Sequence, residues 1–463
     1  MHPNSGSANR QPDLLPRSKR PTIPIAEDHR LVQMTDTLDW TAMEERAQQI
    51  RSAKLKNAAG RPPHLRALLG AMLLMAIRKL TYREAEDLIC YYAPARYLCG
   101  LTETEWTPDF TTIQDFTELM GEEGINLINQ YVVQLAVKQK LADPRTLVAD
   151  TTAQEAAIPY PNEMGLMSGF LRSVAAAGRK VGRAMKGFVE QTVSQFQVAG
   201  QKAREYRLFA KTKESKDRVM TQMITIVEKL NAHLGKALGE AAAQGAKLRK
   251  YAIVAKSKLV QLHETMSKLL PQIRYWIRTG YVASGKIISL HIPQLYSIVR
   301  GKVGKSVEFG LSWGIRRLAG GYLLATLAQD RRALQDTKFA VRAVKDHVAL
   351  FGKAPLAYAY DRGGYSAENV SALRKLGVKE VGLAPRGRTP WSVSRPVRDR
   401  LVRERALVEA GIGTIKGSRY GFNRPAARSD SMMGACGQRA VLGFNTNKLV
   451  RELAGRKEMR LSG

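Results

Sequence analysis

The chain has 463 residues, of which 44% are hydrophobic and 25% are charged. These proportions exclude an intrinsically disordered protein and are typical of a globular chain that buries a full core, in about two or three domains. Lysine and arginine number 73 against 41 acidic residues, so the net charge is +32 and the favoured partners are nucleic acid or an anionic membrane surface.

Other features of the composition narrow this choice. No run of about 18 or more residues is both apolar and free of charge, so we expect no membrane-spanning helix. The N-terminal residues contain no apolar segment of the kind that marks a secretory signal. Cys90, Cys99 and Cys436 form no C-x-x-C pair, and we expect them to be reduced packing residues of a cytosolic protein.

Local patterns divide the chain into four parts. Residues 1–30 lack periodicity and are rich in Pro, Ser, Asn and Arg, which predicts a mobile basic arm. Residues 31–140 show apolar positions at helical spacing, with Thr81 as a helix cap, and predict an all-helical domain. Residues 141–162 and 281–463 alternate strand-like and helical runs, and residues 163–280 are helical throughout.

The alternating part predicts an α/β fold, a mixed sheet with flanking helices. A helix is expected at 330–350. The strand-like runs are Thr146–Asp150, Ile287–Ile292, Val307–Trp313, Gly321–Leu327, Ala357–Asp361 and the weaker Val378–Ala384.

The helical segment 163–280 is too long for a loop and predicts an inserted subdomain. Its charges are predominantly positive, as at Arg179, Lys180 and Arg183. One interpretation is a set of solvated helix faces. We favour the other, a helical arm that lies along DNA phosphates, because the excess has one sign and opposite charges at helical spacing are sparse.

Three acidic residues occupy positions suited to phosphodiester chemistry. Asp150 and Asp361 each close an apolar run that resembles a buried strand, and open α/β sheets place their chemistry at the carboxyl ends of strands. Glu409 lies in a helical stretch, 400–416. Carboxylate oxygens suit a pair of Mg²⁺ ions about 3.5–4 Å apart, which can activate a nucleophile and stabilise the leaving oxygen. Taken singly, each aspartate could start a turn, and the glutamate could be an ordinary exposed helix residue.

The residues around Glu409 carry further positive charge. Arg405, Glu409 and Lys416 project from one helix face. A basic and aromatic cluster suited to phosphate and base contact follows this helix: Arg419, Tyr420 and Arg424. The segment from Gly301 to Ser306 resembles a phosphate-binding loop, but Val299 stands where the Walker motif requires glycine, so we do not expect ATP binding.

Several segments of the chain resemble bacterial insertion-sequence transposases of the DDE class. They are Leu65–Met120, Asp150–Pro161, Gly301-Lys302 with Val307–Gly310, Asp361–Tyr365, and Glu409–Lys416 running into Arg419–Arg424. The family's Tyr…Arg…Glu…Lys signature is matched by Arg405, Glu409 and Lys416, whereas Val402 stands in the place of tyrosine.

This resemblance implies an RNase H-like catalytic domain that cleaves DNA and transfers strands. It also implies that the helical N-terminal domain, residues 31–140, binds DNA. It implies that Asp150, Asp361 and Glu409 hold two Mg²⁺ ions, for which Mn²⁺ can substitute. The implied partners are double-stranded DNA, as transposon ends and target, and a second copy of the chain in a homodimer. The expected location is the bacterial cytoplasm, at the nucleoid. Two alternatives stay open: a catalytically silent DNA-binding protein, and a stand-alone structure-specific nuclease.

Overall fold

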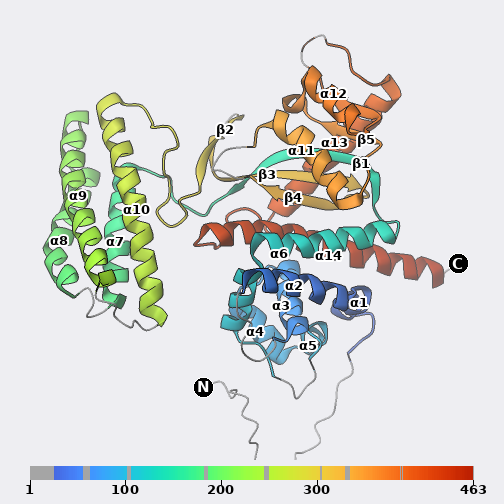
Figure 1. The fold of residues 1–463 in the computed structure, drawn as a ribbon, viewed down its shortest axis with the longest axis horizontal. Coiled ribbons are helices and arrows are strands. Elements are labelled where there is room, and N and C mark those ends of the chain that lie inside the picture. The colour runs from blue at the N-terminus through green and yellow to red at the C-terminus, as the bar shows by residue number, and fades with distance from the viewer. Residues whose placement is uncertain are drawn as a thin grey trace, which may run out of the picture.

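The structure of the protein is a computed structural model, and it is organised as a helix-covered sheet with a separate group of long helices to one side (Figure 1). It describes residues 25–55, 63–101, 106–181, 186–243, 250–302, 305–328, 334–385, 387 and 389–461. Most of the expected basic arm, residues 1–24, lies outside the described residues.

The N-terminal part is helical, as its periodicity predicts. Its helices are α1 (Arg30–Thr37), α2 (Trp40–Lys54), α3 (Leu65–Arg78), α4 (Tyr82–Tyr91), α5 (Ala93–Leu98) and α6 (Phe110–Lys138). Thr81 caps α4 as expected, in a capping box with Glu84. Every residue of α3 from Ala67 to Ile77 is buried, because α3 is the central helix of this group.

The sheet contains six strands within the described residues. They are β1 (Asp143–Glu155), β2 (Tyr296–Lys302), β3 (Lys305–Ala319), β4 (Leu323–Leu327), β5 (Ala357–Tyr360) and β6 (Glu380–Leu383). The strand order is β2-β3-β1-β5-β6, and β4 also pairs with β3. The pairs that involve β3 are antiparallel, whereas β1, β5 and β6 run parallel. The sheet is therefore mixed, and the predicted α/β class is confirmed.

The strands alternate between two separate cores, as the period of two along a strand requires. Leu147 and Ala149 of β1 belong to the core shared with α1–α6 and with α11 (Asp336–Phe351), whereas Val148 faces the other way. The core around Val148 is closed by α13 (Arg395–Lys416) and by part of α14 (Asp430–Leu461). The two faces of the sheet are thus covered by different helices.

The helices α6 and α14 pack side by side between the sheet and α1–α5 (Figure 1). Buried amides tie them to the sheet: Asn445 donates to Asn129 at 2.7 Å and to the Leu323 carbonyl oxygen at 2.6 Å. A short helix, α12 (Ala367–Lys375), covers β6. The N-terminal helices and the sheet therefore share one continuous core.

The segment predicted to be a helical insertion consists of four long helices. They are α7 (Glu163–Val181), α8 (Lys186–Leu208), α9 (Lys213–Ala243) and α10 (Lys250–Thr279). These helices have a core of their own, separate from the two cores of the sheet. Figure 1 shows them standing to one side, beyond β2.

Two predictions at the strand level are wrong. Ile287–Ile292 forms no strand; Ile287 and Leu290 bury in the helical core while Ile288 and Ile292 bury in the sheet core, so the apolar run bridges two cores. The strand that follows, β2, was not predicted. Asp150 does not end its strand either, because β1 stays paired with β3 as far as Glu155. The helix predicted at 330–350 is α11, of which residues 330–333 lie outside the described residues.

Candidate active site

Asp150 and Asp361 lie next to each other where β5 leaves β1. The parallel register pairs Thr146 with Ala357 and Val148 with Ala359. Continued by two residues along each chain, the same register sets Asp150 opposite Asp361, and neighbouring strands are about 4.8 Å apart. Asp361 is the first residue after β5 and caps the short 3₁₀ turn Arg362–Gly364. The sheet thus brings these two carboxylates together.

Strand alternation turns both side chains toward α13. Asp150 has the parity of Val148, and Asp361 has the parity of Ala359, and both of these apolar residues belong to the core beneath α13. Glu409 lies on that helix, next to the buried Val408. The third predicted carboxylate is therefore on the helix that covers the face of the sheet carrying the other two.

Glu409 is the outermost of the three acids. Its side chain is 63% exposed, and it forms an ion pair with Arg405 of 3.8 Å, one helical turn earlier. Burial and the charge of Asp336 raise the pKa of Asp361, and the charge of Arg405 opposes part of that shift. Arg405 therefore lies within electrostatic range of both the sheet edge and the helix glutamate.

The carboxylates of the site repel one another and are partly buried, and both effects disfavour their ionised forms. Burial, together with the charges of Asp361, Asp336 and Glu409, raises the pKa of Asp150 to about 6. The backbone N–H of Thr151 opposes this shift by donating to Asp150 Oδ1 at 2.7 Å. Burial and Asp336 also raise the pKa of Asp361. Clustered carboxylates of this kind are stabilised by a bound cation.

A fourth carboxylate, that of Asp336, belongs to the same site, and the sequence patterns did not identify it. Its Oδ1 accepts hydrogen bonds from Thr151 Oγ1 at 2.8 Å and from Tyr360 Oη at 3.0 Å. Thr151 follows Asp150, and Tyr360 precedes Asp361, so both donors have the opposite strand parity and face α11. Asp336 is the first residue of α11, and an acid at a helix start is ordinary in sequence terms. Only its hydrogen bonds to Thr151 and Tyr360 identify Asp336 as part of the site.

The donor set is suited to a hard divalent cation, because carboxylate oxygens are the ligands that Mg²⁺ and Mn²⁺ prefer. Among the residues that the structure describes, however, no three His, Cys, Asp or Glu side chains are close enough to share a metal ion. The aspartates are fixed by backbone hydrogen bonds, whereas Glu409 is exposed and paired with Arg405. The structure thus brings Asp150 and Asp361 together but leaves Glu409, on the covering helix, outside a shared metal cluster.

The cations predicted to follow the glutamate helix surround its C-terminal end. Lys416 is the last residue of α13, and Arg419 is exposed with its guanidinium 5.5 Å from the centre of the Tyr420 ring. Arg424 pairs with Glu155 at 3.3 Å, and its side chain remains 69% exposed. Tyr420 is buried and packs edge-on against Phe444 at 5.9 Å. Its ring therefore serves as a core residue in this conformation.

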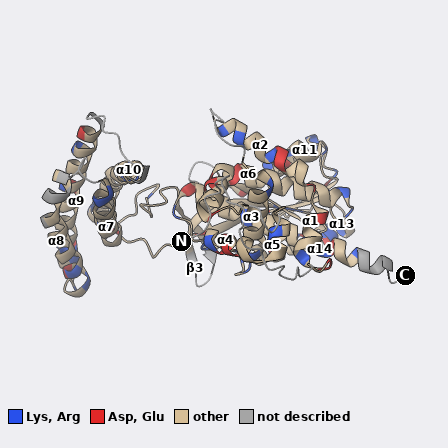
Figure 2. Cartoon of the chain, turned by 90° about the horizontal axis from the view of Figure 1, so that it is seen from below, with Lys and Arg blue, Asp and Glu red and all other residues tan. Residues whose placement is uncertain are grey.

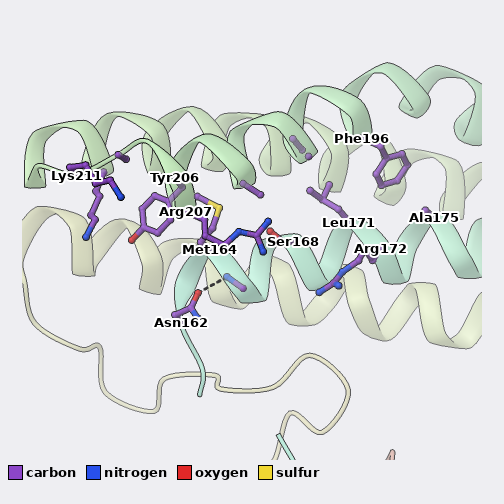
Figure 3. A pocket seen from close by; sticks show the side chains of 16 residues that line it. Asn162, Met164, Ser168, Leu171, Arg172, Ala175, Phe196, Tyr206, Arg207 and Lys211 are labelled. Atoms are coloured by element: carbon purple, nitrogen blue, oxygen red, sulfur yellow. Dashed lines mark hydrogen bonds between the residues drawn. The ribbon is translucent and has the colours of Figure 1, made fainter. Parts of the chain in front are cut away.

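The cations predicted for the helical unit are at the end of α7. Arg179 and Lys180 are both exposed, and Arg183 lies outside the described residues. A hollow of about 840 Å³ opens between α7 and α8, with Met164 and Leu171 on its floor and Arg172, Arg207 and Lys211 at its margin (Figure 3). Figure 2 shows Lys and Arg on the outer surfaces of both parts of the molecule. Positive charge is thus available on each.

This fold and site define an α/β protein with paired aspartates at a sheet edge and a glutamate on the covering helix. Residues 21–119 match the family model described as Transposase domain (DUF772), a segment that runs from before α1 into α6. The chain therefore carries a transposase domain, and the resemblance to transposases is confirmed. No curated protein and no solved structure matches the chain.

None of the helices within the described ranges combines the length and the apolar character needed to cross a bilayer.

Proposed function

We propose that the protein is a metal-dependent transposase of the DDE class with an RNase H-like catalytic unit. It would bind the inverted-repeat ends of an insertion sequence, cut the DNA by water attack and join the freed 3′-hydroxyl to a target strand. The observation that carries this proposal is the shared register of Asp150 and Asp361 on the sheet face that α13, the helix of Glu409, covers.

Asp150, Asp361 and Glu409 would hold two Mg²⁺ ions, for which Mn²⁺ can substitute. Such ions lower the pKa of bound water and neutralise charge on the leaving oxygen. The chain's own groups do the positioning: the N–H groups of Thr151 and Gly363 donate to Asp150 and Asp361 at 2.7 and 2.8 Å, and so fix how each carboxylate is turned.

Asp336 would act as a positioning residue. It contacts the neighbours of both aspartates from the α11 face, so it ties β1 to the end of β5 without reaching the face of Glu409. Partners that orient metal ligands commonly contribute about 10–100-fold in metal affinity or activity. The hydrogen bonds to Thr151 and Tyr360 would keep the two carboxylates in register while DNA enters.

Double-stranded DNA is the proposed partner, both as transposon ends and as target. The net charge of +32 supports a polyanionic ligand. Arg405 and Lys416 would hold phosphates beside the cut, Arg419 and Arg424 the strand beyond it, and the helical unit would contact backbone through residues such as Arg179 and Lys180. Because two ends must be cut together, we expect a homodimer, acting at the bacterial nucleoid.

The test is a strand-transfer assay with a labelled element end, Mg²⁺ or Mn²⁺, and a target plasmid. We expect cleaved and joined products from the wild-type protein, and a loss of both of at least about 100-fold for Asp361→Asn. Full activity of that variant would contradict the proposal. End binding without any metal-dependent product would identify a silent DNA-binding protein, and nicked product that is never joined would identify a stand-alone nuclease.

A further inference from the structure

A small cavity of about 250 Å³ lies where three parts of the chain meet. Arg30 comes from the first residue of α1, Arg419 from the segment that follows α13, and Arg451 from α14. The rest of its wall is formed by Thr414, Tyr420, Phe444, Asn447 and Lys448. We call this cavity the arginine pocket. It is distinct from the carboxylate site, and three guanidinium groups converge on it from distant parts of the sequence.

The positive charges of the arginine pocket are not neutralised. No acidic side chain in the described part of the chain forms an ion pair with Arg30, Arg419 or Arg451. The nearby Glu452 is already engaged, because it pairs with Lys448 and accepts a hydrogen bond from Tyr322 at 2.8 Å. Of the four cations that line the pocket, only Lys448 therefore has an acidic partner within the described residues, and the three arginines have none.

The repulsion between these charges affects the pKa of Arg30. Loss of solvent around its guanidinium lowers its pKa, and the charges of Arg419, Arg451 and Arg78 lower it further. Gathering like charges costs free energy unless an anion binds among them. The fold nevertheless keeps Arg30 in place, with its Nη2 donating to the Asn447 carbonyl oxygen at 3.3 Å.

The wall of the pocket also holds Arg419 in place. Tyr420 is buried against Phe444, and the guanidinium of Arg419 is 5.5 Å from the centre of the Tyr420 ring. The backbone that follows the arginine is therefore anchored in the sheet core through Tyr420 and Phe422. The pocket rests on the packed aromatic residues Tyr420 and Phe444, while its arginines reach it as exposed side chains.

We propose that the arginine pocket binds a phosphate group of the DNA backbone. Guanidinium groups present paired N–H donors that match phosphate oxygens, and a cavity of this size suits one phosphate and excludes a base pair. Arg30 belongs to the segment that matches the transposase domain, and Arg419 follows the last residue of the glutamate helix by three positions. One phosphate would thereby link the N-terminal domain to the helix of Glu409.

This inference rests on the proposed function only in taking DNA as the carrier of the phosphate. Its test uses the full chain in EDTA, so that no cleavage occurs and a failure of catalysis leaves the result unaffected. Fluorescence anisotropy with a labelled duplex is measured over a range of salt concentrations for the wild-type protein and for Arg451→Gln, Arg451→Lys and Lys353→Gln. Arg451 and Lys353 are both exposed, and Lys353, which precedes β5, does not line the arginine pocket.

We expect Arg451→Gln to reduce the slope of log affinity against log salt by about 0.9, the value for one lost phosphate contact. Arg451→Lys should keep most of the slope because it keeps the charge, and Lys353→Gln should leave it unchanged. Arg30→Gln should reproduce the effect of Arg451→Gln from a different helix. A slope for Arg451→Gln equal to that of the wild-type protein would overturn the proposal.

A second measurement separates DNA phosphate from free phosphate. Inorganic phosphate is compared with chloride at equal ionic strength in thermal unfolding. If phosphate raises the Tm of the wild-type protein but not of Arg451→Gln, while the two proteins have the same salt slope on duplex DNA, the pocket takes a free anion and the assignment to DNA is wrong. A smaller salt slope for Arg451→Gln than for the wild-type protein, together with competition between phosphate and the duplex, supports the assignment to DNA.

Discussion

The substitution Asp150→Asn should make the protein more stable at alkaline pH while abolishing cleavage. Asparagine has nearly the same volume, and its amide oxygen can still accept the hydrogen bond from the Thr151 N–H. What it removes is a negative charge that the folded protein holds close to three other carboxylates. A residue retained for chemistry at a cost in stability is expected in an active site.

The magnitude follows from the pKa. Burial and the neighbouring acids raise the pKa of Asp150 from 3.8 to about 6, and each unit corresponds to about 1.36 kcal/mol. The fold therefore favours the protonated carboxyl: this contribution is fully present below about pH 4 and is lost as the pH rises through 6. Above pH 7 the ionised group lowers the free energy of unfolding by at most about 3 kcal/mol, and Asp150→Asn should recover that amount.

The assay is urea unfolding of both proteins at pH 4, 6 and 8, in EDTA and with Mg²⁺. We expect the variant's gain to be largest at pH 8 and to vanish near pH 4. Mg²⁺ should stabilise the wild-type protein more than the variant, because a bound cation relieves the same repulsion. A variant that is no more stable than the wild-type protein at pH 8, with an unchanged m value, would refute this account of the charge cluster.

Three further predictions concern single contacts. Asp336→Ala should raise the Mg²⁺ concentration for half-maximal cleavage by about 10–100-fold. Asp336→Asn keeps an oxygen acceptor and should raise that concentration much less. A positioning role would be contradicted by equal losses in both variants, or by Mg²⁺ affinities from calorimetry that do not change in the same order. Arg316 is buried with two unsatisfied guanidinium nitrogens and its nearest carboxylate, Asp346, 4.0 Å away, so Arg316→Met should raise the unfolding free energy by about 1–4 kcal/mol in urea; a loss of stability would argue against an unsatisfied charge. At Gly310 an added Cβ would lie 1.8 Å from the Gln154 carbonyl oxygen, so Gly310→Ala should cost about 3 kcal/mol or more, whereas Gly239→Ala, with open space around the Cβ, should not lower the Tm.

Local sequence patterns were sufficient for much of the fold. Helical periodicity and caps such as Thr81 predicted the N-terminal helices, and the helical character of residues 163–280 predicted an inserted helical subdomain. The structure shows this segment as four long helices with a core of their own. Apolar runs located β1 and β5 because these strands are buried on both faces. The same runs pointed to Asp150 and Asp361, because an acidic residue directly after an apolar run can be recognised from the local sequence alone.

Long-range pairing decided the rest. Ile287–Ile292 has the composition of a strand, but its side chains divide between two cores, which no local pattern can reveal. β1 continues past Asp150 because β3 supplies hydrogen-bond partners as far as Glu155. Asp336 is an ordinary acid at a helix start until Thr151 and Tyr360 are brought to it from two strands.

The amino-acid sequence by itself determined which residues can carry charge or bind a phosphate, and which segments become helix, because these depend on residue chemistry and near neighbours. Only the tertiary structure decided that Asp150 stands beside Asp361, that α13 covers that face, and that Arg30, Arg419 and Arg451 share a pocket. Contacts between distant segments form only where strand register and helix packing bury the most apolar surface together, and that is a property of the whole chain.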